Sequence, residues 1–518
     1  MRQMLHIFKK DIRGLWGELA VFLCCLVLAC WSFPFGSARE GRFDLEGSWA
    51  GEVLVLMAGC YLIARLIHAE AIPGSTQFWI TRPYRWPSLL GAKMLFILVC
   101  AHVPVFVAQA VLLSLADFPV WANLAGLFWT QVLMLACVSL PAAGIAAVTR
   151  GLAGFSLVTV VGLASGLLLA LVRNYAPAAA LSNGSLYEVI PSHINGFVWA
   201  TYAILAVALA AAALSVLVAQ YSKRKTFLSR ALLFGISLTG VALSLFGGPG
   251  LAWPIQALAS RQSLNTMSFQ FSLGRPTFMA ATNDQGFVAE WPPASFETTH
   301  VEISLPLLIS GMTPGSDVGT ENVSLSFESA DGETRGSHTV EVTVFRAGQI
   351  GMTSGGELHV PLIVQIGNGK FFEKLRNSPS TVRGYIDLFR MGNERSLTVP
   401  GTSFPVNVTN AFRCGLENMR PGKPFSKDLS CRVAFRWPLE SIDVNGGSFV
   451  KAESFSPFPA NLRLNPILYR YPAFWLSESD RIDFKVREPV SYVRREFEIH
   501  NVQLMEGPET KRGWRPGQ

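Results

Sequence analysis

The sequence has 518 residues, of which 50% are hydrophobic and 15% are charged, with a formal net charge of +7. Soluble domains usually carry about 25% charged residues, so the composition excludes an ordinary soluble protein and indicates a membrane protein. The first 250 residues hold 16 bases and 9 acids, which leaves 27 of each for the remainder out of totals of 43 and 36, so the positive excess belongs to the hydrophobic half.

The chain opens with an amphipathic segment, MRQMLHIFKKDIRGLW. Its residues Leu5, Phe8, Ile12 and Trp16 recur at helical spacing and fall on one side, which suits a helix lying at a membrane surface. The apolar run that follows lacks a small-residue cleavage site. We therefore expect a retained helix there and not a secretory signal.

Seven hydrophobic runs are long enough to cross a bilayer, which takes about 20 residues at helical rise. They lie near residues 15–33, 50–67, 94–115, 122–147, 151–172, 196–219 and 229–247. No such run recurs after about residue 262. The sequence thus predicts an α-helical membrane bundle of about seven spans over residues 1–250, followed by a domain of another kind.

The positive charges predict an orientation, because short cytoplasmic loops are enriched in Lys and Arg. With a cytoplasmic N-terminus, the inner segments carry thirteen bases and three acids, whereas the outer segments carry three bases and six acids. An odd number of spans then makes the C-terminal domain extracytoplasmic. We expect a multi-pass protein of the inner membrane with the lipid bilayer as a partner. Because topology accounts for the positive excess, nucleic acid is not expected as a partner.

Residues 68–93, HAEAIPGSTQFWITRPYRWPSLLGAK, form a polar, proline-broken stretch on the predicted cytosolic side, between the second and third spans. This stretch resembles the signature of the type-2 exporter class of ABC transporter permeases. That signature has a glutamate, a Gly-Thr-like pair, an apolar patch, a proline near a basic residue, and a Gly-x-Lys-like start to the third span. The matching residues are Glu70, Gly74 with Ser75 and Thr76, Phe78, Trp79, Arg82, Pro83, Arg85, Gly91 and Lys93.

The resemblance implies a short coupling helix that docks into a groove of a separate ATPase subunit. It also implies a permease that works as a homodimer or heterodimer. Phe78 and Trp79, flanked by Arg82 and Arg85, have the aromatic and arginine composition of an interface anchor. Alternatively, the aromatic residues lie in the headgroup belt and the bases only follow the positive-inside rule.

The chain also departs from that family. The family usually has six spans and ends in the cytosol, whereas this sequence adds a seventh span and a large external domain. Ala71 stands where a basic residue often follows the glutamate, and Pro73 breaks the segment early. A second function therefore stays open: a non-transporting, membrane-anchored scaffold that displays a β domain for binding a glycan, a peptide or an envelope protein.

Three polar residues lie inside the predicted spans, namely His102, Gln109 and Gln131. Such side chains are costly to expose to lipid, so we expect them to face the interior of the bundle. There they would either form helix-to-helix hydrogen bonds or line a substrate path.

The second half of the sequence predicts antiparallel β structure. In VEISLPLLI, residues 301–309, the odd positions are apolar, which is the period of a strand with one buried face. Further alternating segments lie at 323–327, 340–344, 358–366, 433–437 and 482–486. Many short strands separated by turn residues predict one or two extracytoplasmic β sandwiches over residues 262–505, with residues 506–518 as a flexible tail. Pro306 and Pro361 would fit best on edge strands.

Cysteine usage agrees with an external second half. Six of the eight cysteines lie in the hydrophobic spans, and only Cys414 and Cys431 fall in the β region. In an oxidising compartment this pair predicts a disulfide, worth about 3 kcal/mol by chain entropy. The alternative is two unpaired thiols.

Signals of catalysis are weak. The segment GNGK at 367–370 lacks both the first glycine and the final Ser or Thr of a phosphate-binding loop, and no HExxH, CxxC or GxSxG motif with the right context is present. The eight histidines are scattered without ligand spacing. We therefore expect no enzyme activity, no cofactor and no metal in this chain, and an ATPase supplied in trans.

Overall fold

The structure is a computed structural model. It describes residues 2–32, 45–69, 85–162, 164, 200–223, 226–235, 255–258, 269–280, 301–312, 317–336, 342–344, 350–352, 357–366, 369–392, 395–400, 403, 405–417, 427–434, 441–444, 447–448, 451–452, 467–471, 475–476, 481–487 and 489–506. The chain divides into two compact units. The first comprises Met1–Leu167, Thr201–Gly247 and Arg395–Val486, and the second Leu168–Ala200, Gly248–Glu394 and Arg487–Gln518.

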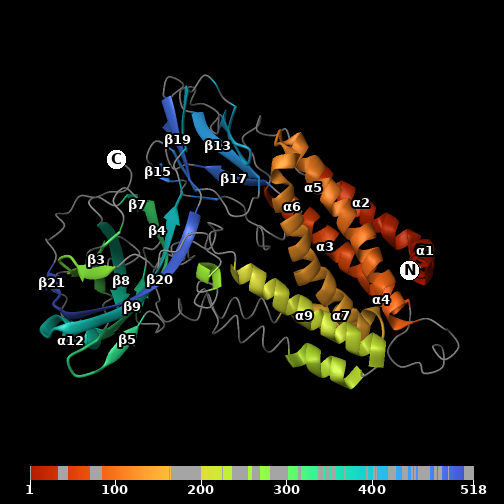
Figure 1. Ribbon diagram of the computed structural model, residues 1–518, viewed down its shortest axis with the longest axis horizontal. Helices are drawn as coiled ribbons and strands as arrows, with labels where there is room; N and C mark the ends of the chain where they lie inside the picture. The colour runs from red at the N-terminus through yellow and green to blue at the C-terminus, as the bar shows by residue number, and fades with distance from the viewer. Residues whose placement is uncertain are drawn as a thin grey trace. The chain divides into compact units, whose positions relative to one another are not determined.

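Helices make up the N-terminal part of the first unit and are coloured red to yellow in Figure 1. They are α1 (Arg2–Gly14), α2 (Trp16–Ser32), α3 (Leu45–His68), α4 (Trp86–Phe96), the π-helical η2 (Ile97–His102), α5 (Val103–Leu115), α6 (Val120–Met134), the π-helical η3 (Leu135–Ser139), α7 (Leu140–Val148) and α9 (Ala200–Lys223). One apolar cluster runs through α1 to α4 and on to α7 and α9. The helical N-terminal part expected from hydropathy is therefore confirmed.

Four helical stretches among the described residues are long and apolar enough to cross a membrane: Gly51–His68, Trp86–Leu115, Val120–Val148 and Ala203–Ser222. They correspond to the spans expected at 50–67, 94–115, 122–147 and 196–219. A fifth is possible if α1 and α2, which meet at a bend of 71°, count as one broken span. For the spans expected at 151–172 and 229–247, the described parts are the shorter apolar helices Leu152–Gly162 and Thr226–Gly235. The count of seven thus stays a prediction.

Two of the long stretches contain a π-helical turn followed by proline. Val103 N–H donates to the carbonyl of Leu98 at the end of η2, and Leu140 N–H donates to that of Leu135 at the end of η3. Pro104 and Pro141 come next in each helix and have no N–H to donate to the carbonyl four residues earlier. A wider turn absorbs this missing bond, so each helix continues through its proline.

The strands of the first unit form two sheets. The strands are β10 (Arg395–Pro400), β11 (Val406–Thr409), β12 (Phe412–Glu417), β13 (Lys427–Ala434), β14 (Ser441–Val444), β15 (Gly447–Ser448), β16 (Lys451–Ala452), β17 (Ile467–Tyr471), β18 (Trp475–Leu476) and β19 (Arg481–Arg487). One sheet has the order β10-β19-β14-β15, and the other β11-β12-β13-β17-β16 with β18 also on β13.

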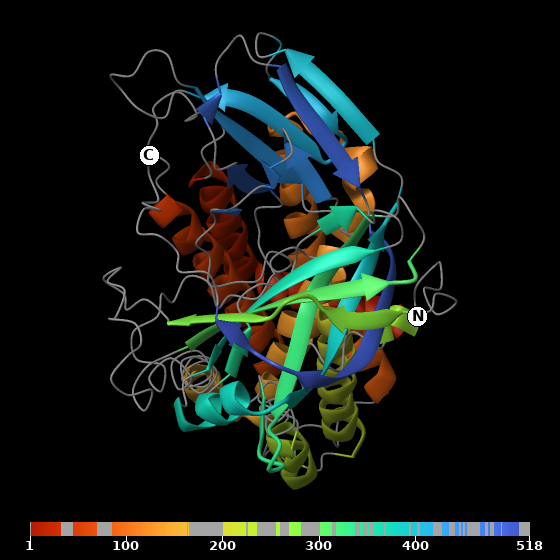
Figure 2. The same cartoon turned by 90° about the vertical axis from the view of Figure 1, so that its left-hand side faces the viewer.

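The second unit is also built from two sheets, whose strands cross the view of Figure 2 in green, teal and dark blue. The strands are β1 (Gln270–Leu273), β2 (Thr277–Ala280), β3 (Val301–Ser310), β4 (Asp317–Glu328), β5 (Thr334–Gly336), β6 (Val342–Val344), β7 (Ile350–Met352), β8 (Leu358–Ile366), β9 (Ser380–Met391), β20 (Pro489–Val502) and β21 (Met505–Glu506). Their orders are β21-β2-β3-β8-β6 with β1 on β3, and β20-β9-β4-β5 with β7 on β4.

Both sheets of the second unit contribute to one apolar core. Leu305 of β3, Phe327 of β4 and Ile386 of β9 are completely buried in it. Phe372 and Leu375 enter the same core from the short helix α12 (Gly369–Asn377). The expected β-sheet region in the second half of the chain is therefore confirmed, and it has two groups of strands.

One group of strands is inserted into the other. β9 and β20 pair antiparallel from Ser380 opposite Val502 to Met391 opposite Pro489, and the strands β10 to β19 lie between them in sequence. The first unit therefore takes its strands from a segment that leaves and re-enters the second unit at adjacent strand ends.

The prolines expected on edge strands lie elsewhere. Pro306 and Pro361 face each other on β3 and β8, which are neighbours within the sheet. The sheet tolerates Pro306 because β2 pairs with β3 up to Ser304 and β1 pairs with it from Leu307, so no ladder bond is required from residue 306 on that side. The edge-strand prediction was wrong because it ignored such gaps between successive partner strands.

Candidate coupling region

The predicted coupling loop lies between α3 and α4. Six of its eight expected residues (Glu70, Gly74, Phe78, Trp79, Arg82 and Pro83) lie outside the described residues. Arg85 is exposed at the N-cap of α4, where its extended backbone and a proline in the first turn start the helix. The described structure around the loop therefore consists of the ends of α3 and α4 and of the side chains that hold them.

Lys93 on α4 is completely buried and forms an ion pair with Asp11 of α1. Its Nζ donates to Asp11 Oδ2 at 2.9 Å, and the two side chains are 0% and 4% exposed. Burying two charges is costly unless they are paired, so this contact fixes how α1 sits on α4. Lys93 was expected as part of the coupling loop, and the structure gives it a packing role between these two helices.

Apolar contacts support the same junction. Phe8 of α1 and Phe96 of α4 meet edge to face with ring centroids 6.4 Å apart. A Cβ on Gly91 would lie 3.1 Å from Met4 Sδ, so glycine allows a close approach of the two helices there. The first helix is therefore held against α4 by side chains of both kinds.

The C-terminal end of α3 is tied to two other helices. Arg65 donates from Nε to Glu18 Oε1 on α2 at 3.1 Å. His68 Nε2 and Thr149 Oγ1, at the end of α7, are 3.1 Å apart, and the His68 ring lies edge-on to Phe155. The sequence analysis did not identify these contacts. Together they bring the start of α2 and the ends of α3 and α7 close to one another.

The three polar residues expected in the bundle interior hydrogen-bond to one another. His102 Nδ1 lies 2.9 Å from Gln131 Oε1, and Gln131 Nε2 donates to Gln109 Oε1 at 2.8 Å. His102 Nε2 also lies 3.0 Å from Ser139 Oγ, a partner that the sequence analysis missed. These bonds join the Trp86–Leu115 helix to the Val120–Val148 helix, which favours the helix-to-helix interpretation over a substrate path.

A short sequence signal marks the missed serine. The segments CAHVP, from Cys100, and CVSLP, from Cys137, share the pattern Cys-x-His/Ser-x-Pro, and each lies where a π-helical turn ends. His102 and Ser139 hold the same place in the two segments. Comparing the prolines of the two spans would have pointed to Ser139.

The other end of α5 meets the strands of the first unit. Asp117, in the loop between α5 and α6, accepts from Arg413 Nη1 of β12 at 2.9 Å. Asn123 Nδ2 donates to the carbonyl of Asn410 at 3.1 Å. A small apolar cluster lies beside these bonds and contains Leu113, Ala116, Phe118, Leu127, Ala411 and Ala434. Asp117 has a positive φ of 61°, a conformation that Asp tolerates better than most residues and that often marks a functional constraint.

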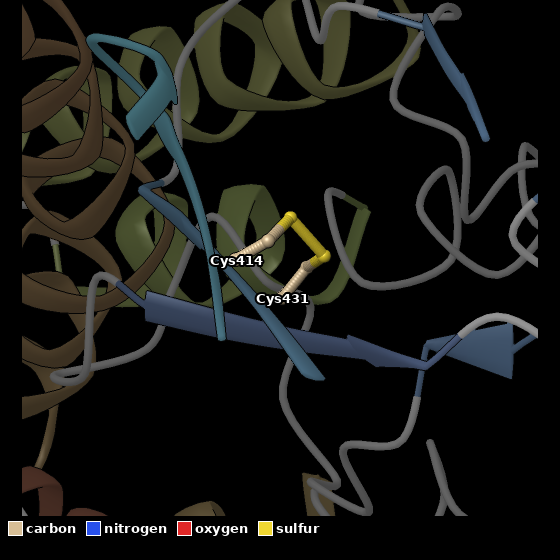
Figure 3. Close-up of a disulfide and its surroundings, with 2 residues drawn as sticks. All are labelled: Cys414 and Cys431. Atoms are coloured by element: carbon tan, nitrogen blue, oxygen red, sulfur yellow. A yellow bond between two sulfur atoms is a disulfide. The ribbon is translucent and has the colours of Figure 1, made fainter. Parts of the chain in front are cut away.

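The cysteine pair lies on the strands that make this contact. Cys414 and Cys431 are direct cross-strand partners on β12 and β13, and both are buried. Their Sγ atoms are joined (Figure 3). In the structure this bond holds β12 and β13, which carry Arg413 and Ala434, in register. The disulfide stays a prediction for the protein in solution.

No model of a known protein family matches this chain, and no curated protein is significantly similar to it. Among the residues that the structure describes, no three His, Cys, Asp or Glu side chains gather as metal ligands would.

Proposed function

We propose that this chain is the membrane subunit of an ABC-type exporter, driven by a separate ATPase and working as a dimer. In this proposal the chain is a multi-pass protein of the inner membrane with a cytoplasmic N-terminus. The strands after residue 262 form sandwich-like extracytoplasmic domains. The resemblance of residues 70–93 to the permease signature suggests the ATPase partner, and the geometry of the helices supports a route for movement.

One observation carries the proposal: a single helical stretch, Trp86–Leu115, connects the coupling loop to the strands of the first unit. At 1.5 Å per residue, its 30 residues span roughly 45 Å, which exceeds the hydrocarbon thickness of about 30 Å. One end starts just after the loop, next to Arg85. The other leads directly into Asp117, which binds Arg413. Movement of the loop would thus reach the β region through one continuous helix.

The same contacts support a two-sided arrangement. Arg65, Lys93 and Arg230, all expected on the cytosolic side, make their ion pairs or hydrogen bonds with helix ends of that side. Asp117, expected on the external side, bonds to the β region. An extracytoplasmic β domain would make contacts of this kind with the outer helix ends only.

The test is capture of the ATPase by the coupling loop. The variant Trp79→Ala with Arg82→Glu and Arg85→Glu should lose most pull-down of a co-expressed ATPase subunit, because truncating an aromatic anchor commonly costs about 2 kcal/mol or more. Its abundance in the membrane should not change, since two bases are few against the thirteen inner bases that set topology.

A matched control carries the same change of charge elsewhere on the predicted cytosolic side. This control is Phe227→Ala with Arg224→Glu and Lys225→Glu, where Phe227 is 87% exposed. The control should keep the ATPase. Unchanged pull-down by the loop variant at unchanged abundance would reject coupling through this loop and favour the display scaffold instead.

A further inference from the structure

The first helix has two distinct faces. Met4, Ile7, Phe8 and Ile12 pack on the helical core. The opposite face carries Arg2, His6, Lys9 and Arg13, all exposed, at spacings of four, three and four residues that place them in one stripe along the helix. We call these four residues the basic stripe.

The stripe is not balanced by an acid of its own helix. The single acidic residue of α1 is Asp11, which is turned inward and bound to Lys93. Within α1, the ion pair with α4 therefore removes the one negative charge from the surface and leaves the exposed face positive.

The apolar residues of the N-terminal segment are not all packed on one face, contrary to what the sequence predicted. Of the four apolar residues expected on one side, Phe8 and Ile12 pack against the core, whereas Leu5 and Trp16 are 44% and 66% exposed. Leu5 lies between the packed face and the basic stripe when the residues of α1 are placed on a helix of 3.6 residues per turn, whereas Trp16 is the first residue of α2. Since α1 meets α2 at 71°, α1 lies close to the membrane plane if α2 enters the bilayer.

We infer that the basic stripe binds the headgroups of anionic phospholipids in the leaflet where α2 begins. A helix lying in the interface places apolar residues toward the acyl chains and bases toward phosphates, and the exposed Leu5 beside the stripe fits this order. Arginine binds phosphate through two parallel hydrogen bonds, which adds to the attraction between charges. This inference does not depend on an ATPase partner.

The test measures lipid preference in the purified full-length chain in a neutral detergent. The probes are fluorescent phosphatidylglycerol, which is anionic, and phosphatidylcholine with the same label. The wild type should prefer the anionic probe, and salt should weaken the preference. A base near an anionic surface contributes roughly fivefold, so Arg2→Gln with Lys9→Gln and Arg13→Gln should lower the preference by up to about a hundredfold.

A control with the same loss of charge separates the stripe from net charge. It carries Arg275→Gln, Arg395→Gln and Arg481→Gln, three exposed bases of the β region, and should keep the preference. If the triple stripe variant does not elute as a single species, Arg13→Gln alone should lose roughly fivefold. An unchanged preference in the stripe variants, or an equal loss in the control, would overturn the inference. Loss of ATPase pull-down with unchanged lipid preference would instead assign the stripe to a protein partner.

Discussion

The buried pair of Asp11 and Lys93 gives a sharp energetic prediction. Lys93→Met leaves a carboxylate that is 4% exposed without its ammonium partner, and Asp11→Leu leaves a completely buried ammonium without its carboxylate. Removing one partner of a buried ion pair typically costs about 3 to 5 kcal/mol, because the remaining charge stays desolvated and loses its opposite charge. Each single variant should therefore be strongly destabilised.

The double variant, Asp11→Leu with Lys93→Met, should recover most of that loss. Two apolar side chains of similar volume need no compensation, and such replacements of buried ion pairs are often neutral or stabilising. The pair should thus show a coupling energy of several kcal/mol in a double-mutant cycle. Additive effects of the two substitutions would refute the assignment of a direct buried interaction.

Thermal unfolding of the detergent-solubilised chain measures these differences. At about 2 to 4 °C per kcal/mol, a cost of 3 to 5 kcal/mol lowers the midpoint by roughly 6 to 20 °C. Arg65→Met is the matched control, since it breaks the pair with Glu18, in which Arg65 is 42% exposed. Pairs of that kind contribute about 1 kcal/mol or less, so the control should shift the midpoint by only a few degrees. Equal shifts for Lys93→Met and Arg65→Met would contradict the burial of Lys93.

Three further outcomes are expected. Alkaline phosphatase fused after residue 262 should be active, because the charge asymmetry places that point outside the cytosol, and activity of a cytosolic reporter there would reverse the topology. Cys414 and Cys431 should resist thiol labelling after unfolding unless a reductant is added, and labelling without reductant would exclude the bridge. The hydrogen bond from Lys374 holds the pKa of the Asp331 carboxyl well below its usual range. Its stabilising contribution should be fully present above about pH 5 and be lost as pH falls through the lowered pKa, so the difference in melting temperature between wild type and Lys374→Met should be constant above about pH 5 and shrink progressively below it.

Local periodicity was enough to predict several elements. The alternation of 301–309 predicted β3, in which Ile303, Leu305 and Leu307 are completely buried. Hydropathy predicted the four long helices in the same way. The insertion of β10 to β19 between two paired strands was not predictable by this route, because Ser380 and its partner Val502 are 122 residues apart and no period connects them.

The polar contacts between the helices were likewise only partly predictable from local sequence. The cost of burying polar groups in lipid predicted that His102, Gln109 and Gln131 face inward, but not which groups they bind. Asp11 counted in the sequence only as one of three inner acids, since nothing local relates it to Lys93, 82 residues away. The sequence thus predicted some of the polar residues that lie between the helices. Only the structure shows which of them pair with one another.

The paired π-helical turns affect how the Trp86–Leu115 helix can carry movement. A turn next to proline is a place where a helix bends easily, so a rod with such a turn would transmit displacement poorly by itself. Here the turn ends at His102, whose two ring nitrogens meet Gln131 and Ser139 on the neighbouring helix, and Ser139 ends the π turn of that helix. Bending either helix at this level would stretch hydrogen bonds to the other. The network therefore stiffens both weak points together, and the two helices resist bending as a pair.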